Sequence, residues 1–96
     1  MEYKEALERL SFQTEIFKAL AHPTRIFIVE QLLNHEYCVN ELTKMIGVEM
    51  PTISKHLSVL RNVGIITSRK ENNNVFYRIK QKCVQDTLVC ANKMTS

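Results

Sequence analysis

The sequence predicts a mostly α-helical domain with one β-hairpin, in the order α-α-α-α-β-β-α. Three observations predict this class. Apolar residues recur at helical spacing over most of the chain, only two glycines and two prolines interrupt regular structure, and β-forming residues follow Gly64. The 96 residues fit one domain, residues 1–96, and the core of so small a domain gains stability from a dimer interface.

Two amphipathic helices are expected in the first third of the chain. Over Tyr3–Leu20 apolar residues mostly follow helical spacing, and we expect an interruption near Ser11. Pro23 then opens a second helix that ends near Asn34, because proline is tolerated in the first turn of a helix. The buried stripe of this second helix is expected to consist of Ile26, Val29, Leu32 and Leu33.

Two short helices joined by a tight turn follow. The first, Val39–Ile46, ends at Gly47, a residue suited to the left-handed conformation that terminates helices. The second begins at Met50 or Pro51 and ends at Asn62, with Gly64 closing it. The residues expected to face the core are Leu42, Met45 and Ile46 in the first helix and Ile53, Leu57 and Leu60 in the second. This arrangement is typical of a helix-turn-helix.

A hairpin and a last helix complete the prediction. The strands are expected at Ile65–Ser68 and Val75–Ile79, with the three asparagines of Asn72–Asn74 at the tip, since asparagine tolerates positive φ. A final helix runs from about Gln81 to Lys93. A hairpin directly after a helix-turn-helix predicts a winged helix-turn-helix, with the hairpin as the wing.

The charge is distributed unevenly along the chain. Residues 1–49 hold five Lys and Arg against eight Glu, a net charge of −3, whereas residues 50–96 hold eight Lys and Arg against Glu71 and Asp86, a net charge of +6. A basic surface built by the second half suits a polyanion such as nucleic acid, although a solvated basic face would have the same composition.

The polar residues of this basic half form a candidate DNA interface. Hydroxyls and cations on the outer face of the predicted helix 50–62 suit the major groove, and cations on the hairpin suit the neighbouring backbone or minor groove. The candidate DNA-binding residues are Thr52, Ser54, Lys55, His56, Ser58, Arg61, Arg69, Lys70 and Arg78.

Other classes of function have less support. The chain shows no glycine-rich phosphate loop, paired carboxylates or His-x-x-x-His pattern, so we do not expect this protein to be an enzyme. It shows neither a signal peptide nor an apolar run of about 18 residues, so a cytoplasmic protein with no membrane partner is expected.

Three segments together resemble the ArsR/SmtB family of winged-helix repressors: Phe17–Ile26 (FKALAHPTRI), Pro51–Arg61 (PTISKHLSVLR) and Val75–Ile79 (VFYRI). The resemblance covers nearly the whole chain. It implies a homodimer assembled through the first and last helices, which binds a roughly palindromic double-stranded DNA operator and leaves it when an inducer binds. It also implies DNA contacts at Thr52, Ser54, Lys55 and His56.

The chain departs from the family pattern at several positions. Glu49 and Met50 stand where the family commonly has Ser and Gln, so a good N-cap and a base-reading amide are missing. The segment Glu36–Leu42 (EYCVNEL) keeps only the first of the two cysteines found in many metal sensors of the family. The zinc ligands of the last helix are replaced at positions that correspond to Gln81, Cys83 and Met94.

The remaining candidates for sensing are Cys38, Cys83 and Cys90. On one helix Cys83 and Cys90 share a face but lie roughly 10.5 Å apart along the axis, too far for one ion to bind both. In an antiparallel pair of last helices, Cys83 of one subunit could approach Cys90 of the other and bind a thiophilic ion such as As(III), or be oxidised. The alternative is that all three cysteines are small buried residues.

The leading hypothesis is therefore a dimeric DNA-binding repressor released by a thiophilic metal or metalloid ion or by cysteine modification. One alternative is a repressor without a metal site. Two others are a winged-helix module for protein interaction and a thiol-based metal carrier, of which the carrier leaves the polar helix face unexplained.

Overall fold

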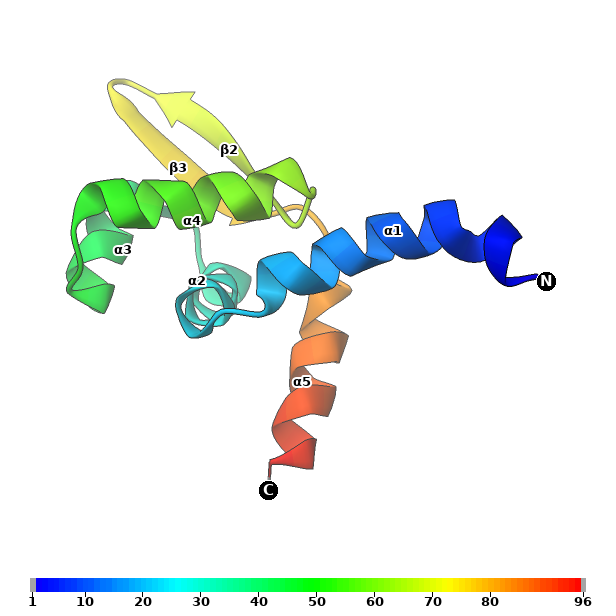
Figure 1. Cartoon of the computed structure of the whole chain (residues 1–96). Helices are drawn as coiled ribbons and strands as arrows, with labels where there is room; N and C mark the ends of the chain where they lie inside the picture. The colour runs from blue at the N-terminus through cyan, green and yellow to red at the C-terminus, as the bar shows by residue number, and fades with distance from the viewer. Residues whose placement is uncertain (1, 96) are drawn as a thin grey trace.

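The structure, a computed structural model, describes residues 2–95. Its elements follow the order α1 (Tyr3–Leu20), α2 (Pro23–Asn34), β1 (Tyr37–Cys38), α3 (Val39–Ile46), α4 (Met50–Asn62), β2 (Ile66–Glu71), β3 (Asn74–Ile79) and α5 (Val84–Met94). Helices α2, α3 and α4 and the sheet surround the core, whereas α1 and α5 project away from this body (Figure 1). The predicted winged helix-turn-helix is confirmed.

Helix α1 runs without a break, so the predicted interruption near Ser11 is wrong. A serine in an exposed helical position costs only a fraction of a kcal/mol relative to alanine, about 0.5, which the hydrogen bonds of the helix outweigh. Residues 11–18 of the helix are exposed, and Thr14 Oγ1 donates to the carbonyl of Leu10 at 2.7 Å. No helix within residues 2–95 is long and apolar enough to cross a membrane.

Helix α2 begins and ends where the sequence predicts. His22 is its N-cap, and the His22 Nδ1 atom accepts a hydrogen bond from the backbone N–H of Thr24 at 3.1 Å. The predicted buried stripe is only partly right. Val29 and Leu32 are buried, but Ile26 and Leu33 are half-buried and Ile28 is fully buried instead, because neighbours cover α2 on more than one side.

The helix-turn-helix is formed by α3 and α4. Gly47 ends α3 with φ +81°, and its N–H donates to the carbonyl of Thr43 at 2.8 Å. Met45 was predicted to face the core but is 42% exposed. Only a narrow stripe of so short a helix is covered, and Met45 lies on its flank, lining a shallow groove with Phe27. The fully buried side chains contributed by the two helices are Leu42, Ile53, Leu57 and Leu60.

The sheet has three strands in the order β1-β3-β2, all antiparallel. Strand β1 was not predicted, since two residues show no periodicity. The hairpin is longer than predicted: Glu71 pairs with Asn74, so only Asn72 and Asn73 form the turn, and Asn72 adopts φ +57°. Helix α5 starts at Val84 rather than at Gln81. Residues 81–83 form a turn instead, in which the N–H of Val84 donates to the carbonyl of Gln81.

Candidate nucleic-acid interface

The outer face of α4 is polar and open to solvent. The helix buries one side against the core, so residues on the opposite side face away from the body. Thr52, Lys55 and Ser58 are exposed on that side, and Ser54 is half-buried beside them. Within residues 2–95 Lys55 makes neither a hydrogen bond nor an ion pair. This face can therefore offer hydroxyl groups and an uncompensated cation to a polyanion.

The start of α4 lacks a side-chain cap, as its sequence predicts. Glu49 is the N-cap residue, and its carboxylate accepts no hydrogen bond from the first turn. Its carbonyl instead accepts the N–H groups of Thr52 and Ile53, at 3.1 and 3.3 Å. Met50, which stands where the ArsR/SmtB pattern commonly has a glutamine, is 42% exposed.

His56 lies on the flank of α4 that faces the start of α2. It is half-buried, and its ring lies 4.4 Å from that of His22, centroid to centroid, at an interplanar angle of 53°. Partial burial lowers the pKa of His56 below its ordinary value, and the nearby His22, Arg25 and Lys55 lower it further. The His56 ring therefore packs α4 against the start of α2. In its neutral form the imidazole can donate a hydrogen bond from one nitrogen.

Arg61, at the opposite end of α4, reaches the hairpin. Its Nη1 atom donates to Ser68 Oγ of β2 at 3.4 Å, and both groups are accessible. Because successive strand residues point to opposite faces, Ser68 and Lys70 share the face of β2 that meets α4. Lys70 is exposed and has no ion-pair partner among the described residues. The cations of Arg61 and Lys70 therefore lie along one side of the molecule with α4.

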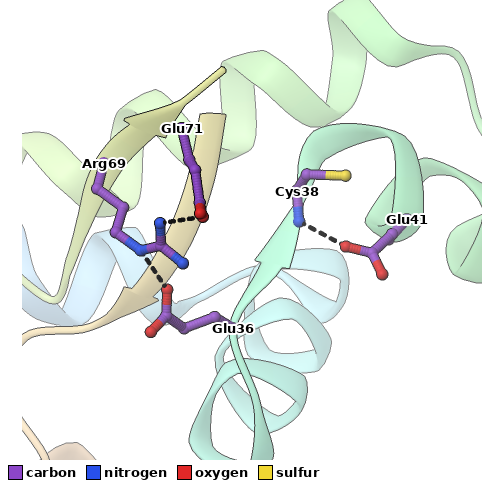
Figure 2. A network of polar contacts seen from close by, with 5 residues as sticks. All are labelled: Glu36, Cys38, Glu41, Arg69 and Glu71. Carbon is purple, nitrogen blue, oxygen red and sulfur yellow. Dashed lines mark hydrogen bonds and ion pairs between the residues drawn. The ribbon is translucent and has the colours of Figure 1, made fainter. Parts of the chain in front are cut away.

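Arg69 points to the other face of the hairpin and is held there by two carboxylates (Figure 2). Its Nε atom donates to Glu36 Oε1 at 2.9 Å, its Nη1 atom donates to Glu71 Oε2 at 2.6 Å, and its guanidinium lies 5.0 Å from the centre of the Phe76 ring. The hydrogen bonds with Glu71 and then Glu36 raise the pKa of Arg69. Arg69 therefore ties the wing to the segment before β1. Sequence reasoning missed Glu36 because β1 itself was missed.

Arg78 also lies on the face that carries Arg69. It stands near the base of β3, where it pairs with Thr67. Its side chain lines a groove with the end of α2 and the start of α5. The structure thus brings together most of the predicted residues on one side, around α4 and Lys70, and separates Arg69 and Arg78 from them by the thickness of the sheet.

The three cysteines are free and lie in different environments. Cys38 is half-buried as the N-cap of α3, and its backbone N–H donates to Glu41 Oε1 at 3.0 Å (Figure 2). That hydrogen bond is the main reason why the pKa of Glu41 is lowered. Cys83 and Cys90 are exposed, at and within α5. The single chain therefore buries none of the three completely.

No group of three or more potential ligands that could hold a metal ion occurs within residues 2–95. A thiol site completed by Cys83 and Cys90 of two subunits stays a prediction.

Comparison with known proteins identifies relatives over much of the chain. A family model described as "Bacterial regulatory protein, arsR family" matches residues 22–68. A biofilm growth-associated repressor of Xylella fastidiosa is 36% identical over 74 residues, which cover 77% of this chain and 65% of the relative. The HTH-type transcriptional regulator Rv0081 of Mycobacterium tuberculosis is 36% identical over 83 residues, covering 85% of this chain and 73% of the relative.

Solved structures share the same fold. The crystal structure of Rv0081 has a TM-score of 0.80 at 33% identity and covers 99% of this chain and 91% of that one. The repressor BigR of Xylella fastidiosa has a TM-score of 0.81 at 29% identity, with 100% and 98% covered. The chain spans about two thirds of the length of the first curated relatives that it matches, 65% for the Xylella repressor.

Proposed function

Because the chain belongs to the arsR family of bacterial regulatory proteins, we propose that it is a homodimeric transcriptional repressor that binds double-stranded operator DNA. In this proposal α4 lies in the major groove and the β2–β3 hairpin follows the adjacent backbone. The observation that carries it is the exposed polar face of α4, which continues through Arg61 to Lys70 on the wing. Relatives that are named repressors support the regulatory role.

The residues of the candidate interface have different roles in this proposal. Thr52, Ser54 and Ser58 face base edges or phosphates, while Lys55, Arg61 and Lys70 neutralise phosphates. His56 donates to a phosphate from the flank of α4. Arg69 and Arg78 contribute less to DNA binding. Arg69 is neutralised by two carboxylates, and Arg78 lines a separate groove.

The dimer is supported by apolar side chains that are exposed in the single chain. Both α1 and α5 carry such side chains, and both helices project from the body (Figure 1). The exposed apolar residues are Tyr3, Leu7, Phe12, Ile16 and Phe17 in α1 and Val89 and Met94 in α5, from 37% to 79% exposed. A helix that exposes several large apolar side chains is typical of a protein interface. These two helices are proposed as the dimerisation helices of the domain.

The DNA-binding proposal can be tested by fluorescence anisotropy. The reduced full chain is titrated onto a labelled palindrome from its own promoter and onto a scrambled duplex of equal length. The expected result is a preference for the palindrome of at least about a thousandfold near physiological salt, with affinity that falls steeply as salt rises. Equal affinity for both duplexes would exclude an operator-specific repressor.

The inducer is proposed to act through the cysteines. Cys83 and Cys90 are exposed on the projecting α5, so the partner's α5 could complete a thiol site for As(III) or another thiophilic ion, or the pair could be oxidised. Cys38 offers a further thiol near the wing. As(III), Cd(II), Zn(II), a persulfide and a mild oxidant are each added to the protein–DNA complex. Release by one agent, lost in a Cys83→Ser/Cys90→Ser variant, would assign the signal, and release by none would leave a repressor without a metal site.

A protein-interaction module with the same fold is the second candidate. The exposed Met45 and Phe27, which line a shallow groove between α2 and α3, could meet a protein partner. This candidate predicts weak DNA binding with no preference for sequence, so the anisotropy experiment separates it from a repressor.

A further inference from the structure

A second groove lies away from the candidate DNA interface, between the end of α2, the base of β3 and the start of α5. It has a volume of 470 Å³ and is lined by residues that include Leu33, His35, Arg78, Lys82 and Gln85. It adjoins a smaller groove of 250 Å³ along α2 and α5, with which it shares Leu33, Asn34 and Gln85. Together the two grooves are large enough for a small organic molecule.

One end of this groove is cationic. Arg78 and Lys82 are exposed on its wall, and neither has a hydrogen bond or an ion pair within residues 2–95. His35 also lines this groove. The one carboxylate at this end, that of Glu36, is already bound by Arg69 at 2.9 Å. Donors without partners at this end can therefore bind an anionic group, and arginine binds a carboxylate through two parallel hydrogen bonds.

The remainder of the groove is apolar in the middle and acidic at its far end. Leu33 and Leu88 are half-buried and form its floor, with Val89 at its edge. Glu30 lies at the far end. An apolar body fits over the leucines, and the carboxylate of Glu30 disfavours a second anionic group there. The groove thus matches a monoanion with a charged head and an apolar body.

The groove shares Val89 with the apolar residues of α5 proposed for the dimer, and it is distinct from the apolar surface of α1. Gln85, Leu88 and Val89 lie on the α2 side of α5, whereas Cys83 and Thr87 line a different cavity against α1. Helical spacing places Cys90 with Cys83, seven residues apart, on that second side. A ligand in the groove would therefore leave the cysteines and the α1 surface free.

We propose that the groove between α2, β3 and α5 binds a small amphipathic monocarboxylate, with its carboxylate on Arg78 and Lys82 and its apolar body over Leu33 and Leu88. Such a ligand bridges α5 to the base of the wing and to the end of α2. The binding of this ligand does not depend on the proposed function. An effect of the ligand on DNA binding rests on the proposed function, since the ligand would then join a dimerisation helix to the DNA-binding elements.

Amide chemical shifts test the binding directly. The reduced, ¹⁵N-labelled full chain is titrated with sodium hexanoate, with sodium acetate as the head alone and with 1-hexanol as the tail alone. We expect saturable shifts at residues 33–36 and 78–85 with hexanoate, and binding at least about tenfold weaker for acetate and for hexanol, because each lacks one of the two contacts. Equal affinity for acetate or hexanol overturns the proposed class of ligand.

Two variants and one control locate the site. Arg78→Gln and Lys82→Gln should each weaken hexanoate binding about tenfold or more, since each loses a charge-assisted hydrogen bond. Lys80→Gln is the matched control, because Lys80 lines the cavity on the α1 side instead. Hexanoate binding that is unchanged in the first two variants, or absent from the wild type, overturns the proposal. All four proteins are compared by thermal melting, so that a folding defect is recognised.

A second readout separates this inference from the proposed function. Hexanoate is added to the complex of the protein with labelled DNA, and release of the duplex is measured by fluorescence anisotropy. A chain that binds hexanoate but no duplex would refute the repressor and leave the carboxylate site intact. A chain that binds its palindrome while its amide shifts ignore hexanoate would refute the site alone.

Discussion

At the scale of single residues, two neighbouring cations of β2 differ in what they can offer DNA. Lys70 is exposed without an ion-pair partner among the described residues, whereas Arg69 is bound by Glu36 and Glu71. The sequence shows two adjacent basic residues on a hairpin and cannot distinguish them. Only the pairing of β1 with β3 brings Glu36 near enough to neutralise Arg69.

The first prediction concerns this difference. Lys70→Ala should weaken binding to most duplexes and lower the slope of log affinity against log salt by about 0.9 per lost phosphate contact. Arg69→Ala should change the slope much less, because its charge is already balanced. Anisotropy titrations from low to high KCl measure both slopes, and Lys93→Ala, at the far end of α5, is the control. Equal slopes for the Lys70 and Arg69 variants would contradict the assignment.

The second prediction concerns pH. The pKa of His56 is lowered in the folded chain, mainly by partial burial and then by His22, Arg25 and Lys55. Between that lowered pKa and the ordinary value near 6.5, the unfolded chain binds more protons than the folded chain. The free energy of unfolding should therefore be highest above pH 6.5 and fall as pH drops below it.

Urea unfolding from pH 8 to pH 5 measures this dependence. His56→Gln should reduce the loss of stability at low pH, because the variant has no imidazole to protonate at that position. His35→Gln is the control, because His35 takes no part in the contact between His22 and His56. A pH dependence that is the same in wild type and His56→Gln would show that His56 does not carry it.

At the scale of elements, the sequence predicts well what depends on periodicity. The bounds of α2, α3 and α4 agree with the expected helices, because each combines an apolar stripe with a cap or a terminating glycine such as Gly47. The missed features depend on partners distant in sequence. Strand β1 exists because Tyr37 and Cys38 pair with Tyr77 and Phe76, and the exposure of Met45 depends on how α3 sits on its neighbours.

In the candidate site, too, features set by local periodicity can be predicted and features set by distant partners cannot. The exposed face of α4 is predictable, since Lys55 and Ser58 lie opposite its apolar stripe. The contact between His56 and His22, and the groove that Arg78 lines, arise from tertiary packing that no local pattern encodes.

The third prediction concerns the hairpin turn. Asn72 adopts φ +57°, a left-handed conformation that disfavours β-branched residues, whereas no positive φ occurs at Asn73. Asn72→Val should destabilise the chain by about 1–2 kcal/mol, and Asn72→Gly should be neutral or stabilising. Asn73→Val is the matched control and should cost less. Chemical unfolding of the three variants measures the differences, and equal losses for both valine variants would show that the turn conformation is unimportant.

At the scale of the whole molecule, the extended shape follows from the two terminal helices. The chain extends over 49 × 33 × 22 Å, with α1 and α5 projecting from a small core (Figure 1). Phe12 and Phe17 of α1 are 66% and 61% exposed. Phenylalanine in such a position gives a single chain little stability, yet its burial between two subunits would contribute substantially to assembly.

The fourth prediction follows from this exposure. A Phe12→Ser/Phe17→Ser variant should fold as the wild type does but raise the dimer dissociation constant by at least about a hundredfold, because each subunit loses two aromatic contacts. Its DNA affinity should fall as well, since a monomer meets only one half of a palindrome. Sedimentation equilibrium measures the assembly, and Met45→Ser, which removes an exposed apolar residue of α3, is the control. A dimer that survives the double substitution and dissociates in Met45→Ser would move the interface from α1 to the helix-turn-helix, where it would compete with DNA.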